Sequence, residues 1–174
     1  MIQIFDTQLE VSLRAMRDVV APALNDAESH VLEQFGLVLA TLEFMRHRLP
    51  YARSFFRLEL THLLSLSESV RALVADDQPA LAAELGQIEA AARNDLARPE
   101  IEIEDYLVMG RKLRELIGEL IRLSNGKSYE KQLDQLTLRN QKEFLPLQRA
   151  WCMPLGLDSR PDELPSIEEI FADT

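Results

Sequence analysis

The chain reads VLEQFGLVLATLEFMRHRLPYARSFFRLELTHLLSL from Val31 to Leu66, and two apolar helical patterns fill this stretch. In the first, apolar residues recur at alternating steps of four and three, the spacing that keeps a heptad seam on one helix face. The seam consists of Val31, Phe35, Val38, Leu42, Met45 and Leu49. Pro50 ends this helix or opens the next, because proline fits only the first turn of a helix. We therefore predict a helix on each side of Pro50, with the seam as the best candidate for packing in the core.

Apolar periodicity predicts helices in most of the remaining chain as well. The segment from about Tyr51 to Val74 is apolar on several sides, which is typical of a central helix in a bundle. Other helical patterns cover residues 6–24, 26–48, 79–98, 106–123 and 128–151. Pro22 lies inside the first of these, so we predict a break between Pro22 and Asn25, with one kinked helix as the alternative.

The fold class that these patterns predict is all-α: an antiparallel helical bundle of five or six helices, with a short C-terminal helix in an acidic tail. We expect a helical bundle domain over residues 1–152 and a proline-punctuated acidic tail over residues 153–174. In the tail, Ser166 and Glu169 have the spacing of a capping box, which predicts the start of the short helix. A helix this short is marginal alone, so its apolar side chains need a surface on which to dock.

Composition limits the functions that are compatible with this chain. Its 174 residues carry a net charge of −10, so no excess of Lys and Arg exists to bind nucleic acid or anionic lipid. Cys152 is the single cysteine, so no disulfide within the chain is expected, and neither a secretory signal nor a membrane span is recognisable. No Gly-rich phosphate loop or nucleophile motif occurs, so we expect no cofactor and assign no catalytic residue. The default expectation is a cytoplasmic soluble protein.

Two carboxylate–histidine pairs have the residue types of a metal site. Glu59 and His62 show Glu-x-x-His spacing, and Glu43 and His47 lie one helical turn apart. Ferritin-like di-metal bundles use Glu-x-x-His twice together with two further glutamates, and the second copy of that motif is missing here. The plainer interpretation is an ordinary pair four residues apart for Glu43 and His47, and a hydrogen-bonded core histidine for His62. We therefore predict no metal site.

Four arginines and a histidine gather between Arg46 and Arg57, which stands out in an acidic chain. We call Arg46, Arg48, Tyr51, Arg53 and Arg57 the basic corner and take them as the candidate ligand-binding residues. Cations at the end of the first helix complement its dipole, but Arg53 lies near the start of the next helix and Arg57 has no acid four residues later. Three partners remain open for this corner: a small anion such as a phosphate or carboxylate, a protein surface, or the acidic tail of the same chain.

Three segments in the first part of the chain read Pro22-Ala-Leu, Glu33-Gln-Phe and Arg48-Leu-Pro-Tyr-Ala-Arg-Ser-Phe-Phe-Arg-Leu-Glu-Leu. Together they resemble small all-helical bacterial proteins to which no activity is assigned. The resemblance covers about the first third of the chain. It implies an all-helical fold and transfers no functional residue.

These observations predict a non-enzymatic interaction or assembly protein that is homo-oligomeric. The seam, the many-sided helix that follows it and Asn140, a polar residue in a core-facing position, would supply the interface. The alternative is a bundle that binds a small anionic or amphipathic ligand at the basic corner. A carboxylate–histidine metal enzyme is the third hypothesis. The C-terminal helix would offer a further surface to a protein partner.

Overall fold

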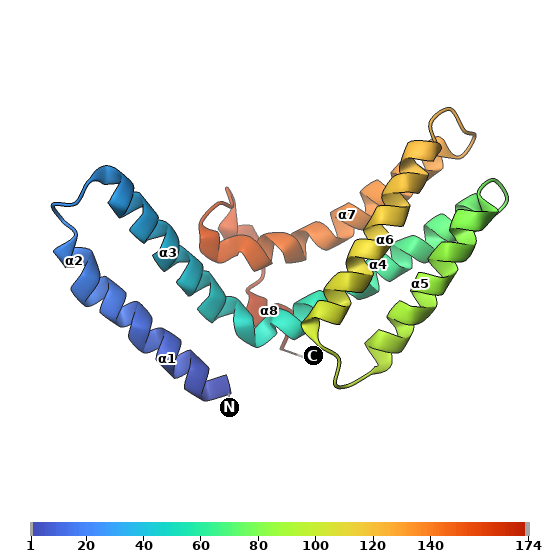
Figure 1. Cartoon of the computed structure of the whole chain (residues 1–174). Coiled ribbons are helices and arrows are strands. Elements are labelled where there is room, and N and C mark those ends of the chain that lie inside the picture. The colour runs from blue at the N-terminus through green and yellow to red at the C-terminus, as the bar shows by residue number, and fades with distance from the viewer. Residues whose placement is uncertain (1, 173–174) are drawn as a thin grey trace. The chain divides into compact units, whose positions relative to one another are not determined.

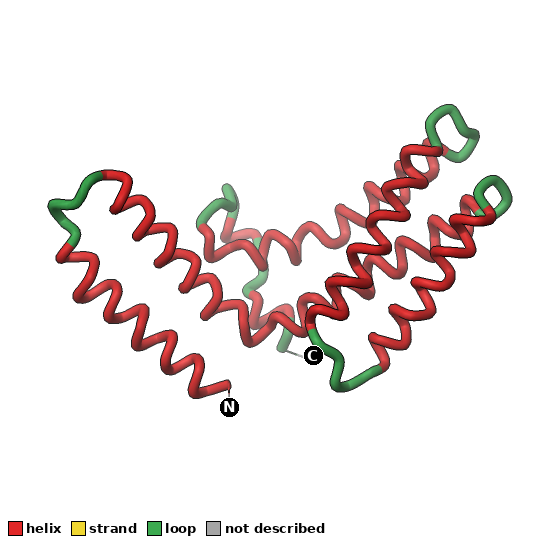
Figure 2. Tube along the Cα trace, viewed as in Figure 1, coloured by secondary structure: helices red, strands yellow, loops and turns green. Residues whose placement is uncertain are grey.

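The computed structural model describes residues 2–172, with the side chains of residues 6–172, and the regular structure of these residues is helical (Figures 1 and 2). The long helices are α1 (Ile2–Ala15), α3 (Ser29–Arg48), α4 (Ala52–Val74), α5 (Pro79–Ala97), α6 (Ile103–Leu123) and α7 (Glu130–Cys152). The shorter helical elements are η1 (Met16–Val20), α2 (Ala21–Ala23), η2 (Leu49–Tyr51), η3 (Met153–Leu155), η4 (Pro161–Glu163) and α8 (Ile167–Ile170). The prediction of an all-α chain is confirmed, since the described residues contain no strand. No helix among them is long and apolar enough to span a membrane.

Both prolines that were expected to limit the first helices lie at or near a helix end. The first helical stretch passes from α1 through the π-helical turn η1 into α2 and stops after Ala23, within the predicted interval. The wider turn of η1 comes shortly before Pro22, whose ring nitrogen has no hydrogen to donate to the preceding turn. Pro50 lies in η2, which joins α3 directly to α4.

Contacts divide the described chain into two compact units. The first unit contains the described residues up to Ala52 together with those from Gln148 onward, and the second contains Arg53–Leu147. The C-terminal tail is thus grouped with the first helices, whereas the sequence placed a boundary between residues 152 and 153. The change of composition at Met153 marks the loss of a helical pattern, but it carries no information about which segment the tail packs on.

In the first unit, α1 and α3 form a helical hairpin (Figure 1). Arg17 of η1 pairs with Glu43 of α3, and Arg46 of α3 reaches Asp6 and Glu10 of α1, each at 3.7 Å. Residue numbers rise along α1 as they fall along α3, so these two helices run in opposite directions. The ion pairs are solvent-accessible and contribute at most about 1 kcal/mol each to stability. They therefore help to align the two helices but add little to the stability of the hairpin.

Arg48 connects the end of α3 to the end of α7. The residue is 5% exposed, and its guanidinium donates from Nη2 to the carbonyl of Ala150 at 2.9 Å and from Nε to the carbonyl of Trp151 at 2.6 Å. These carbonyls belong to the last turn of α7, where no further helical N–H is available to them. Burial lowers the pKa of Arg48, but the pKa of an arginine is so high that the group stays cationic at neutral pH. Arg48 therefore serves as a side-chain cap for α7.

The tail packs on the first unit through α8. Ser166 and Glu169 form the predicted capping box, in which the backbone N–H of Glu169 donates to Oγ of Ser166 at 3.2 Å. Ile167 is buried, and the ring of Phe171 stacks on the ring of Tyr51 with centroids 6.0 Å apart. The apolar side of this short helix thus has the docking surface that its length requires.

Asp158 ties the start of the tail to α7. Its carboxylate accepts two hydrogen bonds from the guanidinium of Arg149, at 2.8 and 2.9 Å, and a third from the backbone N–H of Arg160 at 2.9 Å. All three bonds favour the charged carboxylate. Led by the bonds from Arg149, they lower the pKa of Asp158 from its ordinary 3.8 to about 2.

We expect Asp158→Asn to lower the free energy of unfolding at neutral pH, and the difference from wild type to shrink in acid. A carboxylate whose pKa is lowered by folding stabilises the fold fully above its unfolded pKa, and this contribution is lost as the pH falls through the folded pKa. For Asp158 that window lies between pH 3.8 and about 2. Urea unfolding of both proteins at pH 7 and near pH 3 measures the effect. An equal difference at both pH values would contradict this account of Asp158.

The second unit holds the main apolar core, which lies among α4, α5, α6 and the first part of α7. Its most completely buried side chains are Leu60, Val70, Val74, Leu85, Ile101, Leu113, Leu120 and Leu133. Asn140 and His62 join α7 to α4, because Asn140 Nδ2 donates to the carbonyl of His62 at 3.2 Å and His62 Nε2 lies 2.7 Å from the carbonyl of Asn140. This reciprocal pair fixes how the two helices are aligned.

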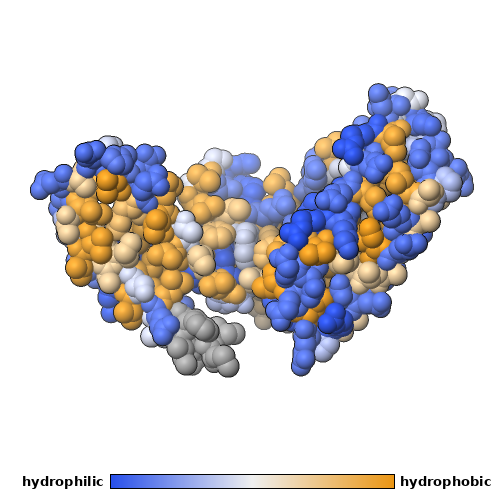
Figure 3. All heavy atoms as spheres, in the orientation of Figure 1, coloured by the Kyte–Doolittle hydropathy of each residue, from blue (hydrophilic) through white to orange (hydrophobic). Residues whose placement is uncertain are grey.

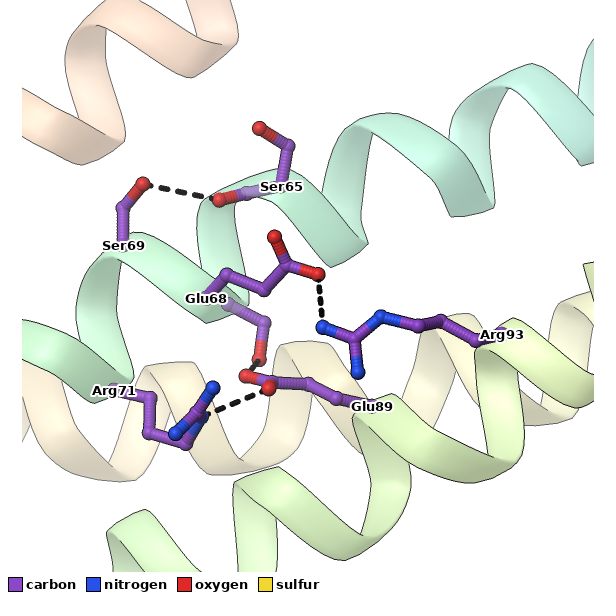
Figure 4. A network of polar contacts seen from close by, with 7 residues as sticks. Ser65, Glu68, Ser69, Arg71, Glu89 and Arg93 are labelled. Atoms are coloured by element: carbon purple, nitrogen blue, oxygen red, sulfur yellow. Dashed lines mark hydrogen bonds and ion pairs between the residues drawn. The ribbon is translucent and has the colours of Figure 1, made fainter.

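Glu89 is a buried carboxylate between α4 and α5 (Figure 4). The residue is 0% exposed, and its two carboxylate oxygens accept from Ser67 Oγ and from Arg71 Nε, both at 2.8 Å. Nearby, Arg93 of α5 pairs with Glu68 of α4 in a more exposed position. A buried charge is tolerated only where donors satisfy it, so α4 and α5 can pack closely only in the alignment that brings Ser67 and Arg71 to Glu89.

Candidate interaction surface

The seam of α3 remains largely open to solvent in the structure. We call its six residues, Val31, Phe35, Val38, Leu42, Met45 and Leu49, the α3 strip. Phe35 and Leu42 are half-buried, but Val38 is 48% exposed and Leu49 is 57% exposed. Figure 3 shows a broad apolar area over α1 and α3. The expectation that this seam lies in the core is therefore wrong for most of its members within one chain.

The neighbours of α3 explain why the strip is left uncovered. α1 packs along one side of α3, where Leu13 is the fully buried residue of the hairpin. The end of α7 and the turn η3 pack on another side, where the rings of Phe44 and Trp151 meet at 6.2 Å. The α3 strip lies on neither of these two covered sides of α3. Further apolar side chains on the hairpin are exposed, namely Val11, Val19, Leu32 and Leu37. Such a concentration of exposed apolar residues is typical of an interaction site.

The three residues of the basic corner that belong to the first unit each have partners within that unit. Arg46 faces Asp6 and Glu10, as described above for the hairpin. Arg48 is buried against the end of α7, and Tyr51 stacks on Phe171 of the tail. These contacts account for the three side chains without a ligand. Part of the corner thus faces the chain's own tail, which was one of the three partners left open.

Arg53 and Arg57 belong to the second unit, where they reach the end of α5. Arg53 Nη1 donates to the carbonyl of Pro99 at 3.0 Å, and Arg57 Nη2 donates to the carbonyl of Leu96 at 3.5 Å. The C-terminus of a helix carries unpaired carbonyls and a partial negative charge, so it attracts cations. The negative partners that the sequence lacked for these arginines are therefore backbone carbonyls: Arg57 binds one in the last turn of α5, and Arg53 binds one just past that helix. Within residues 6–172 neither guanidinium forms an ion pair with a carboxylate.

A groove of about 370 Å³ opens beside these two arginines in the second unit. Its lining consists of Arg53, Ser54, Arg57, Leu96, Ala97, Arg98, Pro99 and Tyr106. The guanidinium groups of three arginines line this groove, and Leu96 and Tyr106 supply apolar surface. The three arginines are Arg53, Arg57 and Arg98. The sequence did not single out Arg98 or Tyr106, because they come from segments about forty residues farther along and only the fold brings them to Arg57.

Three of the four metal candidates are engaged in ordinary contacts. Glu43 pairs with Arg17, and Glu59 pairs with Arg114 at 2.7 Å. His62 bonds to the backbone of α7 and stacks on Phe144, in agreement with a hydrogen-bonded histidine packed at a helix contact. His47 is exposed. Among the residues that the structure describes, no three His, Cys, Asp or Glu side chains cluster closely enough to hold a metal ion.

Comparisons of the chain with protein-family models, with curated proteins and with solved structures found no match. Any function is therefore inferred from the residues and contacts of this chain.

Proposed function

We propose that this protein is a cytoplasmic, non-enzymatic assembly protein that associates with a second copy of itself through the α3 strip. The single observation that carries the proposal is the row Val31, Val38, Met45 and Leu49, which keeps heptad spacing and is exposed along its whole length. Coiled-coil seams with this spacing are normally covered by another helix. A second copy supplies an identical strip, and no different partner is needed.

The strip favours a reversible association. Covering the exposed half of an aliphatic side chain contributes about 1 kcal/mol. The strip supplies four such side chains per copy, and the loss of translational and rotational freedom opposes the gain by several kcal/mol. We therefore expect a concentration-dependent equilibrium between free and assembled chains. The exposed free thiol of Cys152 is compatible with a reducing compartment, which supports the cytoplasmic part of the proposal.

Sedimentation velocity over a range from low to high micromolar concentration tests the proposal. The weight-average sedimentation coefficient should rise with concentration toward the value of a dimer. A strict monomer at the highest concentration would refute self-assembly.

A second candidate function is the binding of a small anion in the groove beside α5. The observation in its favour is that Arg53, Arg57 and Arg98 line one groove and that two of them have no carboxylate partner within residues 6–172. Guanidinium groups are well suited to phosphate and carboxylate groups, because their donors match two oxygens at once. Leu96 and Tyr106 would then contact an apolar part of the same ligand.

Inorganic phosphate should raise the melting temperature of the wild-type protein more than chloride does at equal ionic strength. In the double variant Arg53→Ala/Arg57→Ala this phosphate-specific shift should fall to near zero, whatever the melting temperature without phosphate. Arg111→Ala is the matched control, because Arg111 is an exposed arginine of the same unit that already pairs with Glu104. Equal shifts in all three proteins would refute the anion site and leave the assembly proposal untouched.

A further inference from the structure

We propose that the second copy docks in the opposite direction, so that the two α3 helices lie antiparallel along the α3 strip. In this arrangement Val31 lies level with the partner subunit's Leu49, and the same pair recurs at the other end. Val38 lies level with the partner's Leu42, beside the two-fold axis. The inference rests on the proposed function, because it specifies the geometry of the same self-association.

The spacing of the α3 strip permits this geometry. Its six residues, five in α3 and Leu49 at the start of η2, are separated by steps of four, three, four, three and four, and the series is the same when read backwards. A reversed copy centred on the level of Ala40 therefore places every strip residue opposite another strip residue. Phe35, for example, meets the partner's Met45. Such layers are the condition for knobs-into-holes packing along the whole contact.

The charges along α3 favour the reversed direction over the parallel one. Arg46, His47 and Arg48 occupy the last turn, whereas the first turn holds no acidic residue. A parallel pair would bring both cationic ends together and align the two helix dipoles. The antiparallel pair separates the cationic ends by the length of the strip, about 27 Å, which exceeds the screening length of physiological salt.

The residues that flank the α3 strip allow a second copy to pack against it. In a heptad seam, the flanking positions decide whether two helices attract or repel each other. Here these positions are Leu32, Leu39 and Arg46 on one edge and Gln34, Thr41 and Arg48 on the other. None is a carboxylate, although the chain carries a net charge of −10. Arg46 is already turned toward the acids of α1, and Arg48 toward the end of α7. A second copy therefore meets no repelling carboxylate at the edges.

Site-specific disulfide formation distinguishes the two directions. Val31→Cys and Leu49→Cys are made separately in full-length Cys152→Ser protein, mixed, oxidised, and analysed by mass spectrometry of the linked peptides. The mixture should yield the link between positions 31 and 49, and neither variant alone should link to itself, because identical positions lie too far apart for a disulfide. Ala40→Cys is the control, since residue 40 lies on the side of α3 that faces away from the strip.

The outcomes separate this inference from the proposed function. Efficient linking of Val31→Cys to itself would overturn the antiparallel direction while leaving self-assembly in place. Assembly in sedimentation without any link at positions 31 and 49 would overturn the α3 strip as the interface. A monomer at all concentrations would overturn both. The mixed link, with none for Ala40→Cys, supports the antiparallel pair.

Discussion

Val38→Glu should leave the protein monomeric at concentrations at which the wild type assembles. Val38 and Leu42 are the strip residues nearest the proposed two-fold axis, so Val38→Glu places two carboxylates close together in a surface that loses its water. Both desolvation and mutual repulsion oppose contact, and together they cost about 3 kcal/mol or more. Since 1.4 kcal/mol corresponds to a factor of ten, we expect the dissociation constant to rise at least about a hundredfold. Sedimentation velocity measures the change.

The substitution should not disturb the fold of a single chain. Val38 is half-exposed on α3, and glutamate has a better helix propensity than valine, so helicity and melting temperature should stay close to wild type. Val11→Glu is the matched control. Val11 is 60% exposed and lies two residues before the buried Leu13, so its side chain points away from α3. If both variants lose assembly equally, general acidity rather than the α3 strip is responsible.

Arg71→Ala should strongly destabilise the contact between α4 and α5. Removing this guanidinium leaves the Glu89 carboxylate buried with Ser67 as its remaining donor (Figure 4). Breaking a buried ion pair from one side costs about 3–5 kcal/mol. Arg71 is itself 41% exposed, which lets water reach the site, so we expect a loss of about 3 kcal/mol in the free energy of unfolding. Urea unfolding at neutral pH measures it.

Two further variants show whether the loss of stability comes from the unpaired, buried charge of Glu89. Arg93→Ala removes an exposed arginine that joins the same two helices, and it should cost less than about 1 kcal/mol. The triple variant Ser67→Ala/Arg71→Leu/Glu89→Leu replaces the whole polar group by apolar side chains and should recover most of the stability lost in Arg71→Ala. If the triple variant is no more stable than Arg71→Ala, the loss of the polar contact itself lowers the stability. The unpaired charge of Glu89 is then not the cause.

Periodicity predicted the helices of this chain but could not tell what covers each apolar face. The spacing of Val31, Val38 and Met45 correctly indicated a helix with one apolar side. The same pattern results whether that side meets another helix of the chain or a separate molecule, so the exposure of the strip could be learned only from the fold. By contrast, the capping box of Ser166 and Glu169 was predictable in detail, because all of its atoms lie within one turn.

The contacts that the sequence missed involve partners without a side-chain signature or partners distant in the chain. Arg53 and Arg57 had no acid nearby, and their acceptors are the backbone carbonyls of Pro99 and Leu96. Glu89 lies in an alanine-rich helix where a charged residue is normally solvated. A signal was present on α4, where Ser67 and Arg71 lie one turn apart, but only the packed helices show that both donate to one carboxylate.

The first unit is assembled from the two ends of the described chain, and this has a consequence for synthesis on the ribosome. The α1–α3 hairpin emerges early, whereas Ala150 and Trp151, the acceptors of Arg48, follow about 100 residues later. At about 5–20 residues per second this delay lasts about 5–20 s. During that interval the guanidinium of Arg48 lacks both of these acceptors, and the apolar strip is already exposed. Nascent chains therefore expose the α3 strip before the unit that carries it is complete.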